Sequence, residues 1–179
     1  MRKTMKRKSI IKRTISLLVI CFLGFMSYKI YQKMSHKKQV AQQTATLPVF
    51  SFTDLERNTF TNSNLKGDLA TIFVYFNSEC DYCSYEAQSI QTNLSRFRKA
   101  QFVFISTEDK DVIEKFAREC KLLGVENVIF LRDKVHNFAK NFGANSIPYS
   151  LIYNKQGILL ARYKGQIKAE TILRVLAKQ

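Results

Sequence analysis

Two cysteines separated by two residues, Cys80 and Cys83, form the arrangement in this chain that is best suited to chemistry. An apolar run over residues 69–76 precedes them and an amphipathic segment over residues 84–98 follows, which predicts a strand, a short turn and a helix. Thiols in this spacing can bridge, and the positive end of the helix dipole favours a thiolate on the first. The pair therefore predicts reversible disulfide exchange, in which Cys80 attacks and Cys83 resolves the mixed disulfide.

A CxxC pair can also be half of a zinc site or a purely structural disulfide. Zinc needs four ligands, and the remaining cysteines and histidines of the chain are scattered: Cys21, Cys120, His36 and His136. A disulfide that closes so short a loop would constrain the unfolded chain only slightly. We therefore favour redox exchange, which requires no cofactor, and we predict no metal site.

The net charge of +15 is concentrated in a tail. Residues 1–40 hold eleven Lys/Arg and no Asp/Glu, whereas residues 41–179 hold eighteen Lys/Arg and fourteen Asp/Glu, a net charge of +4. The globular part has no basic stripe, so nucleic acid is not an expected partner.

The first third of the chain has the pattern of a membrane anchor. A basic tail, residues 1–13, carries seven Lys/Arg and precedes an apolar segment, residues 14–31, that has no charge before Lys29. The positive-inside rule places this tail in the cytoplasm and exports the rest. No small-x-small cleavage site follows closely, so we expect a retained transmembrane signal anchor, with the C-terminal domain in the periplasm or cell envelope. Residues 32–47 are polar and predict a linker.

The remaining elements follow from periodicity and turn residues. Strands are predicted over residues 48–55 (an edge strand), 59–61, 102–106, 128–131, 145–153 (with a proline at the start of the strand) and 158–163, and helices over 108–123, 136–142 and 167–176. Strands alternate with helices early and an antiparallel hairpin comes late, which predicts an α/β domain with a mixed sheet and helices on both faces. In the cysteine helix we expect Tyr85 and Ile90 on the packed face, and Cys120 as a small core residue of the next helix.

This order of elements, with Cys80-x-x-Cys83 at a helix start and Ile147-Pro148 before the hairpin, resembles the thioredoxin superfamily over residues 48–179. The opening residues 48–55 and the insertion between residues 106 and 148 resemble the membrane-anchored, extracytoplasmic thiol-disulfide oxidoreductases of the TlpA/ResA type. The resemblance implies a thioredoxin-like fold with a central mixed β-sheet and helices on both faces, preceded by one N-terminal transmembrane helix.

The resemblance also implies roles for single residues. Pro148 would be cis and face the cysteines, and Ile147 would offer its backbone to an extended substrate segment. Glu86 stands three residues after the second cysteine, where a carboxylate could take the proton that Cys83 must lose. A solvent-facing helix residue is the alternative for Glu86, and both stay open. Tyr82, between the cysteines, could contact the partner.

The chain departs from the family at the cysteines. Glu79 stands where Trp is common, and Asp81-Tyr82 replaces a segment that usually contains Pro. Carboxylates on both sides of Cys80 should disfavour its thiolate. Because a stabilised thiolate makes a strong oxidant, these residues favour a reductant.

We therefore expect an enzyme, a protein thiol-disulfide oxidoreductase, whose partners are cysteine-containing exported proteins and a membrane protein that donates electrons. One alternative is a thiol peroxidase of the peroxiredoxin type, although Phe73 and Asn77 stand where that motif has Pro and Thr. A copper-handling thioredoxin-fold binding protein, with His136 and two thiolates as ligands, is another. A redox-inert adaptor is the third.

Overall fold

The computed structural model describes residues 21–32, 34–35 and 38–178. The chain divides into two compact units, residues 1–41 and residues 42–179. In the first unit residues 21–32 are helical. No helix within the described residues is long and apolar enough to cross a membrane. The predicted basic tail, residues 1–13, and residues 14–20 of the predicted anchor lie outside the described residues.

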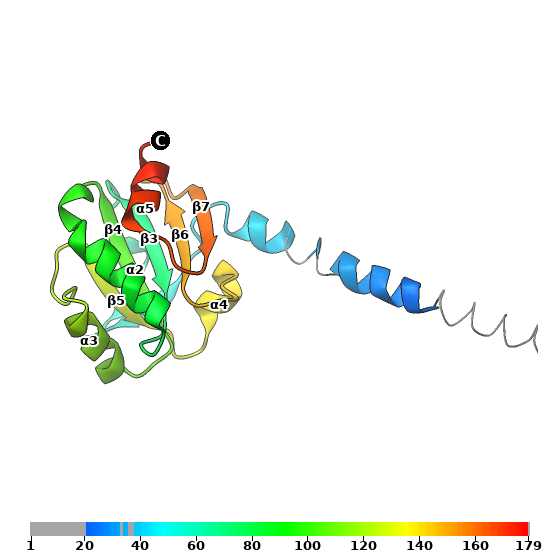
Figure 1. Ribbon diagram of the computed structural model, residues 1–179, viewed down its shortest axis with the longest axis horizontal. Coiled ribbons are helices and arrows are strands. Elements are labelled where there is room, and N and C mark those ends of the chain that lie inside the picture. Colours follow the sequence, from blue (N-terminus) through cyan, green and yellow to red (C-terminus); the bar gives the residue numbers. More distant parts are fainter. Residues whose placement is uncertain (1–20, 33, 36–37, 179) are drawn as a thin grey trace, which may run out of the picture. The chain divides into compact units, whose positions relative to one another are not determined.

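The second unit is built on one sheet of seven strands in the order β2-β1-β5-β4-β3-β6-β7 (Figure 1). The strands are β1 (Ser51–Asp54), β2 (Thr59–Thr61), β3 (Ala70–Tyr75), β4 (Ala100–Ser106), β5 (Val128–Arg132), β6 (Tyr149–Tyr153) and β7 (Leu159–Lys164). β3, β4 and β5 are parallel, and every other pair is antiparallel. The prediction of a mixed sheet is confirmed. The prediction that residues 48–55 form an edge strand is wrong, because β1 pairs with both β2 and β5.

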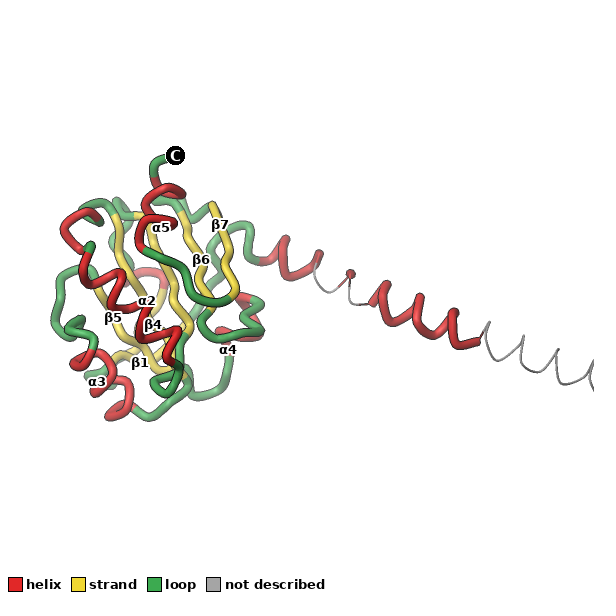
Figure 2. Tube along the Cα trace, in the orientation of Figure 1, coloured by secondary structure: helices red, strands yellow, loops and turns green. Residues whose placement is uncertain are grey.

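Helices cover both faces of this sheet, as predicted. Phe76 and alternate β3 residues pack against side chains of α2 (Asp81–Thr92), α3 (Lys110–Glu119) and α5 (Ala169–Leu176). The opposite face packs against α4 (Asn137–Phe142) and Phe50 and Phe52. Figure 2 shows α2 and α5 crossing in front of the strands. Each face therefore has its own hydrophobic cluster.

The central strand β3 leads directly into the cysteine turn. All six of its residues are buried, as expected for a strand rich in β-branched and aromatic residues inside a parallel sheet. Ile72 and Val74 enter one cluster, and Phe73 and Tyr75 enter the other. The turn that carries Cys80 therefore starts from a strand that is fixed on both faces.

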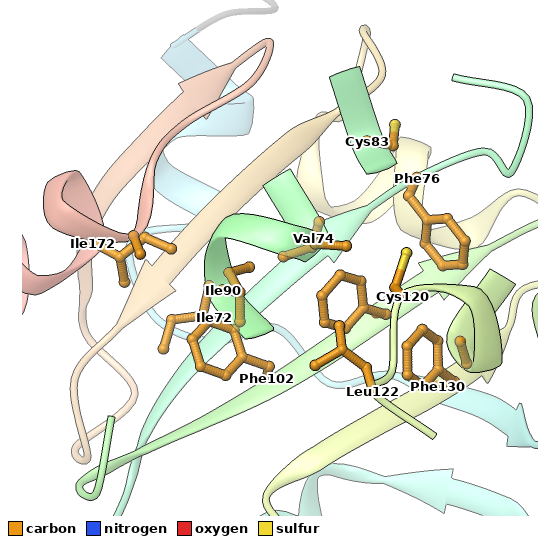
Figure 3. Close-up of a cluster of buried hydrophobic side chains, with 14 of the residues drawn as sticks. Ile72, Val74, Phe76, Cys83, Ile90, Phe102, Cys120, Leu122, Phe130 and Ile172 are labelled. Atoms are coloured by element: carbon orange, nitrogen blue, oxygen red, sulfur yellow. The ribbon is translucent and has the colours of Figure 1, made fainter. Parts of the chain in front are cut away.

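Helix α2 begins at Asp81, so the cysteine pair stands at a helix start as predicted, but part of the expected buried face differs. Cys83, Glu86, Ala87 and Ile90 point into the core. Tyr85, which was expected to pack on the sheet, is 58% exposed. The prediction for Tyr85 is wrong, because these four buried residues recur at helical spacing along one face and Tyr85 lies off that face. Cys120 is buried after α3, in the same cluster as Cys83 (Figure 3).

The compact unit begins before the predicted domain boundary at residue 48. The Tyr153 hydroxyl donates to the Thr44 carbonyl at 3.1 Å, and the Leu47 N–H donates to the Gly157 carbonyl at 2.7 Å. Thr44 and Tyr153 are both fully buried. Residues 42–47, the end of the predicted linker, are thus part of the folded unit.

Candidate active site

Cys80 is the residue that caps the N-terminus of α2. Its backbone is extended, and its carbonyl accepts the first helical hydrogen bonds, from the Cys83 N–H at 2.9 Å and the Ser84 N–H at 3.1 Å. Its side chain makes no capping bond and is partly exposed. The thiol therefore lies at the N-terminal end of α2, where a second protein can reach it.

Cys83 lies one turn inside the helix and is only 1% exposed. Burial is the largest cause that raises the pKa of its thiol above the ordinary value, and a hydrogen bond with the Cys80 thiol raises it further. The backbone of Asn77 acts in the opposite direction and lowers this pKa. Cys83 is therefore held as a thiol next to Cys80, and it must lose a proton before it can attack.

Glu86 is fully buried one turn beyond Cys83. Ser150 Oγ donates to its Oε1 at 2.6 Å, and the Ile167 N–H donates to its Oε2 at 3.2 Å. Burial raises the pKa of Glu86 to about 7, although both hydrogen bonds favour the charged form. The alternative of a solvent-facing Glu86 is wrong. Its charge raises the pKa of Cys83, so the two groups interact.

The Ile147-Pro148 peptide bond is cis, as the resemblance implied. Tyr149, the first residue of β6, pairs with Tyr75, the last residue of β3, so Pro148 is next to the start of the cysteine turn. Pro148 is buried and its carbonyl accepts the Gly165 N–H at 2.9 Å. Ile147 is 42% exposed, and its backbone has no hydrogen-bond partner among residues 38–178. An incoming strand could therefore pair with Ile147.

The surface next to Cys80 combines aromatic and acidic side chains. Tyr82 is 63% exposed and belongs to the first turn of α2, as does the exposed Asp81. Glu79 is exposed on the other side of Cys80. These side chains are available to a partner protein that approaches the Cys80 sulfur.

Sequence reasoning missed the groups that hold the site together. Ser150 and Ile167 donate to Glu86, the Asn77 carbonyl accepts the Cys80 N–H, and the Glu108 carboxylate accepts two hydrogen bonds from Ser78. One signal was available: Ser150 is a polar residue in a strand that is otherwise Tyr149, Leu151, Ile152 and Tyr153.

The residues invoked by the alternative functions do not form the sites that those functions need within the part of the chain that the structure describes. His136 is an exposed residue that precedes α4. Across the part of the chain that the structure describes, no group of three or more His, Cys, Asp or Glu side chains could hold a metal ion. Phe73 is buried in the core, and the Asn77 side chain accepts the Glu79 N–H at 3.0 Å.

Comparisons with known proteins agree with this geometry. The model of the AhpC/TSA family matches residues 43–162. Thiol-disulfide oxidoreductase ResA of Bacillus thuringiensis subsp. konkukian is 22% identical over 178 residues, which are 97% of this chain and 98% of the relative.

Solved structures show the same fold. A thioredoxin-like protein from Aeropyrum pernix superposes with a TM-score of 0.61 at 18% identity, over 84% of this chain and 99% of that one. A secreted Mycobacterium tuberculosis disulfide oxidoreductase homologous to E. coli DsbE has a TM-score of 0.61 at 20% identity, over 76% of this chain and 98% of that one. The predicted thioredoxin-like fold is confirmed.

Proposed function

The chain belongs to the AhpC/TSA family, and we propose that it is a protein thiol-disulfide oxidoreductase that acts through Cys80 and Cys83. The observation that carries the proposal is the pair itself: a partly exposed thiol at the start of α2, one helical turn from a buried thiol whose pKa is raised. The name of the ResA relative agrees with this activity.

The proposed reaction reduces a substrate disulfide in two exchanges. The Cys80 thiolate attacks one substrate sulfur, the substrate S–S bond breaks, and the second substrate sulfur leaves as a thiolate that takes up a proton. The Cys83 thiol then loses its proton and attacks Cys80. The Cys80–Cys83 disulfide forms, and the first substrate sulfur is released as a thiolate. Two electrons pass from the cysteine pair to the substrate.

Glu86, Ile147, Pro148 and Tyr82 would support these steps. A carboxyl group with a pKa of about 7 can accept a proton near neutral pH, so Glu86 is suited to relay the proton of Cys83. The unpaired backbone of Ile147, before Pro148, would align the substrate segment with Cys80. Tyr82 would add apolar contact area to a partner.

We infer that the reaction runs in the reductive direction. A strong oxidant stabilises the thiolate of its reduced form. In this site burial opposes a charge on Cys83, and Glu79 and Asp81 flank Cys80. A reductant must be recharged, so a membrane protein that supplies two electrons per turnover is the second proposed partner.

We also propose that the domain acts outside the cytoplasmic membrane on cysteine-containing exported proteins. Support comes from the seven Lys/Arg residues that precede an uncharged apolar segment. Cell fractionation tests this part: the chain should resist salt washing, be released by detergent, and be cut by protease added to the outer face.

The reduction potential of the Cys80/Cys83 pair tests the activity and its direction. A value near or below about −250 mV is expected for a reductant, and a value near about −120 mV would identify an oxidant. Cys120→Ser in the same chain prevents side reactions. If the two cysteines form no reversible disulfide, the proposal is wrong. Peroxide turnover or stoichiometric copper binding that His136→Ala abolishes would then favour an alternative function.

A further inference from the structure

The turn before Cys80 is held by a carboxylate from another part of the chain. Glu108 follows β4, in the connection to α3, and its Oε1 accepts the Ser78 hydroxyl at 2.6 Å. Its Oε2 accepts the Ser78 backbone N–H at 2.8 Å. Both donors of Ser78 are therefore used by one side chain, from a residue 30 positions away in the sequence.

Glu108 is itself held in place by the end of β4. Its Oε2 also accepts the hydroxyl of Ser106, a fully buried residue at the end of β4, at 2.9 Å, and its own N–H donates to that hydroxyl at 3.2 Å. The next residue, Asp109, forms an ion pair with Arg132 of β5. The carboxylate is thus anchored to the sheet before it reaches the turn.

Ser78 stands between the groups that set the geometry of the two cysteines. The carbonyl of Asn77 accepts the Cys80 N–H at 3.2 Å, and the backbone of Asn77 lies close enough to Cys83 to lower the pKa of its thiol. A shift of Ser78 would move both contacts together. We propose that Glu108 is a positioning residue for disulfide exchange, which holds Ser78 so that the Cys80 and Cys83 sulfurs stay aligned.

A simpler role for Glu108 would be to stabilise the positive end of α3. That role needs only a charge near the helix start, and Asp111 already supplies one in the first turn. It does not need two hydrogen bonds to Ser78. The geometry therefore points to the turn as the purpose of this carboxylate.

Glu108→Gln tests the proposal, because the amide has the same size but only one acceptor oxygen. We expect the equilibrium between the Cys80–Cys83 disulfide and dithiothreitol to shift about fivefold toward the dithiol, since misalignment lowers the effective concentration of one thiol at the other. With insulin as the disulfide substrate, kcat should fall by about tenfold, whereas KM should change by less than about twofold. A residue that only stabilises the fold would change neither the equilibrium nor the kcat to KM split.

Glu114→Gln is the matched control, because Glu114 lies on α3 and its carboxylate, among the described residues, bonds only Arg118, at 2.6 Å. Ser78→Thr keeps both donors and should leave the equilibrium unchanged. Ser78→Ala removes the hydroxyl and should shift the equilibrium in the same direction as Glu108→Gln. In the double variant, Ser78→Ala should add little to the equilibrium shift caused by Glu108→Gln, because both substitutions break the same contact between Ser78 and Glu108.

The proposal is overturned if Glu108→Gln shifts the equilibrium no more than Glu114→Gln, or if the effects of Glu108→Gln and Ser78→Ala add. If Glu108→Gln does not fold, Ser78→Ala and Ser78→Thr decide the question alone, and equal equilibria in these two would overturn it. The inference rests on the proposed function, but dithiothreitol is not a protein substrate. A wild-type chain that equilibrates with dithiothreitol but fails to reduce insulin would contradict the proposed function. The effect of Glu108→Gln on the dithiothreitol equilibrium could still be measured.

Discussion

Glu86 is a carboxyl group in a place where a charge is costly. It is fully buried, and its two hydrogen bonds, from Ser150 and Ile167, offset only part of the cost of desolvation. With a pKa of about 7 it is close to half protonated at neutral pH. A group in that state can both accept and return a proton, as the proposed resolving role of Cys83 requires.

The raised pKa of Glu86 makes the stability of the fold depend on pH. Below about pH 4.5 the group is protonated in the folded and unfolded states. From pH 4.5 to about 7 only the unfolded state ionises, so stability falls as pH rises, by up to about 3 kcal/mol. Glu86→Gln should remove most of this decline. Urea unfolding of the reduced protein at pH 5 and pH 8 measures it, and equal declines in variant and wild type would contradict the prediction.

The two thiols should differ sharply in reactivity. Cys80 is partly exposed at the helix start, whereas Cys83 is 1% exposed and burial raises the pKa of its thiol. Iodoacetamide should therefore modify Cys80 first in the reduced protein, with Cys83 at least about tenfold slower. Peptide mass spectrometry follows both sites. Cys83→Ser should accumulate a mixed disulfide with a substrate, and Cys80→Ser should not; the reverse pattern would exchange the two roles.

At the residue scale, the sequence predicted where the two cysteines lie in the fold but not which groups contact them. Residue type and spacing alone predicted Cys80 and Cys83, and the resemblance added Glu86 and the cis Ile147-Pro148 bond. The Ser150 contact to Glu86 joins residues 64 positions apart. Such contacts depend on the register of β6 against β3 and cannot be derived from local patterns.

At the scale of elements, the parallel strands bring the site together. Cys80 follows β3, Glu108 follows β4 and Asp133 follows β5, and the carboxyl ends of parallel neighbours meet at one edge of the sheet. Periodicity predicted these strands well because they are continuous apolar runs. It failed for the phase of α2, since the buried face includes Glu86, a residue that hydrophobicity assigns to the surface.

The short helix α4 depends on Asp133, which is 1% exposed. Its carboxylate accepts the Asn137 N–H at 3.0 Å and the Phe138 N–H at 2.7 Å. Asp133→Ala would leave both donors without their partner at the helix start, at a cost of about 2 kcal/mol or more in unfolding free energy. Asp111→Ala, an exposed carboxylate in the first turn of α3, is the control. Equal losses for both variants in urea unfolding would refute the role of Asp133.

At the scale of the whole molecule, the strand order could not be read from the sequence. β1 lies between β2 and β5, far from β3 in the sheet although it precedes it in the chain. A polar, aperiodic composition also marked residues 32–47 as a linker, yet residues 42–47 belong to the compact unit. These residues are held by contacts within the same chain, to the buried Tyr153 hydroxyl and to the turn that contains Gly157.

This attachment predicts different behaviour for two shortened chains. A chain that begins at Gln42 keeps the Thr44 and Leu47 contacts, whereas one that begins at Pro48 leaves the buried Tyr153 hydroxyl without its acceptor and loses the Leu47–Gly157 and Ala45–Leu159 bonds. At about 1 kcal/mol for each bond, the shorter chain should be about 3 kcal/mol less stable in urea unfolding.

Tyr153→Phe in the longer chain measures the contribution of the Tyr153 hydroxyl to the free energy of unfolding, which should be about 1 kcal/mol. Tyr153 pairs with Thr71 near the beginning of β3, and Cys80 follows the end of that strand, so the shorter chain should keep its disulfide equilibrium while it remains folded. Equal unfolding midpoints for the two chains would mean that residues 42–47 contact the domain without contributing to its stability. A shifted disulfide equilibrium would instead mean that this attachment reaches the cysteine pair through β6 and β3.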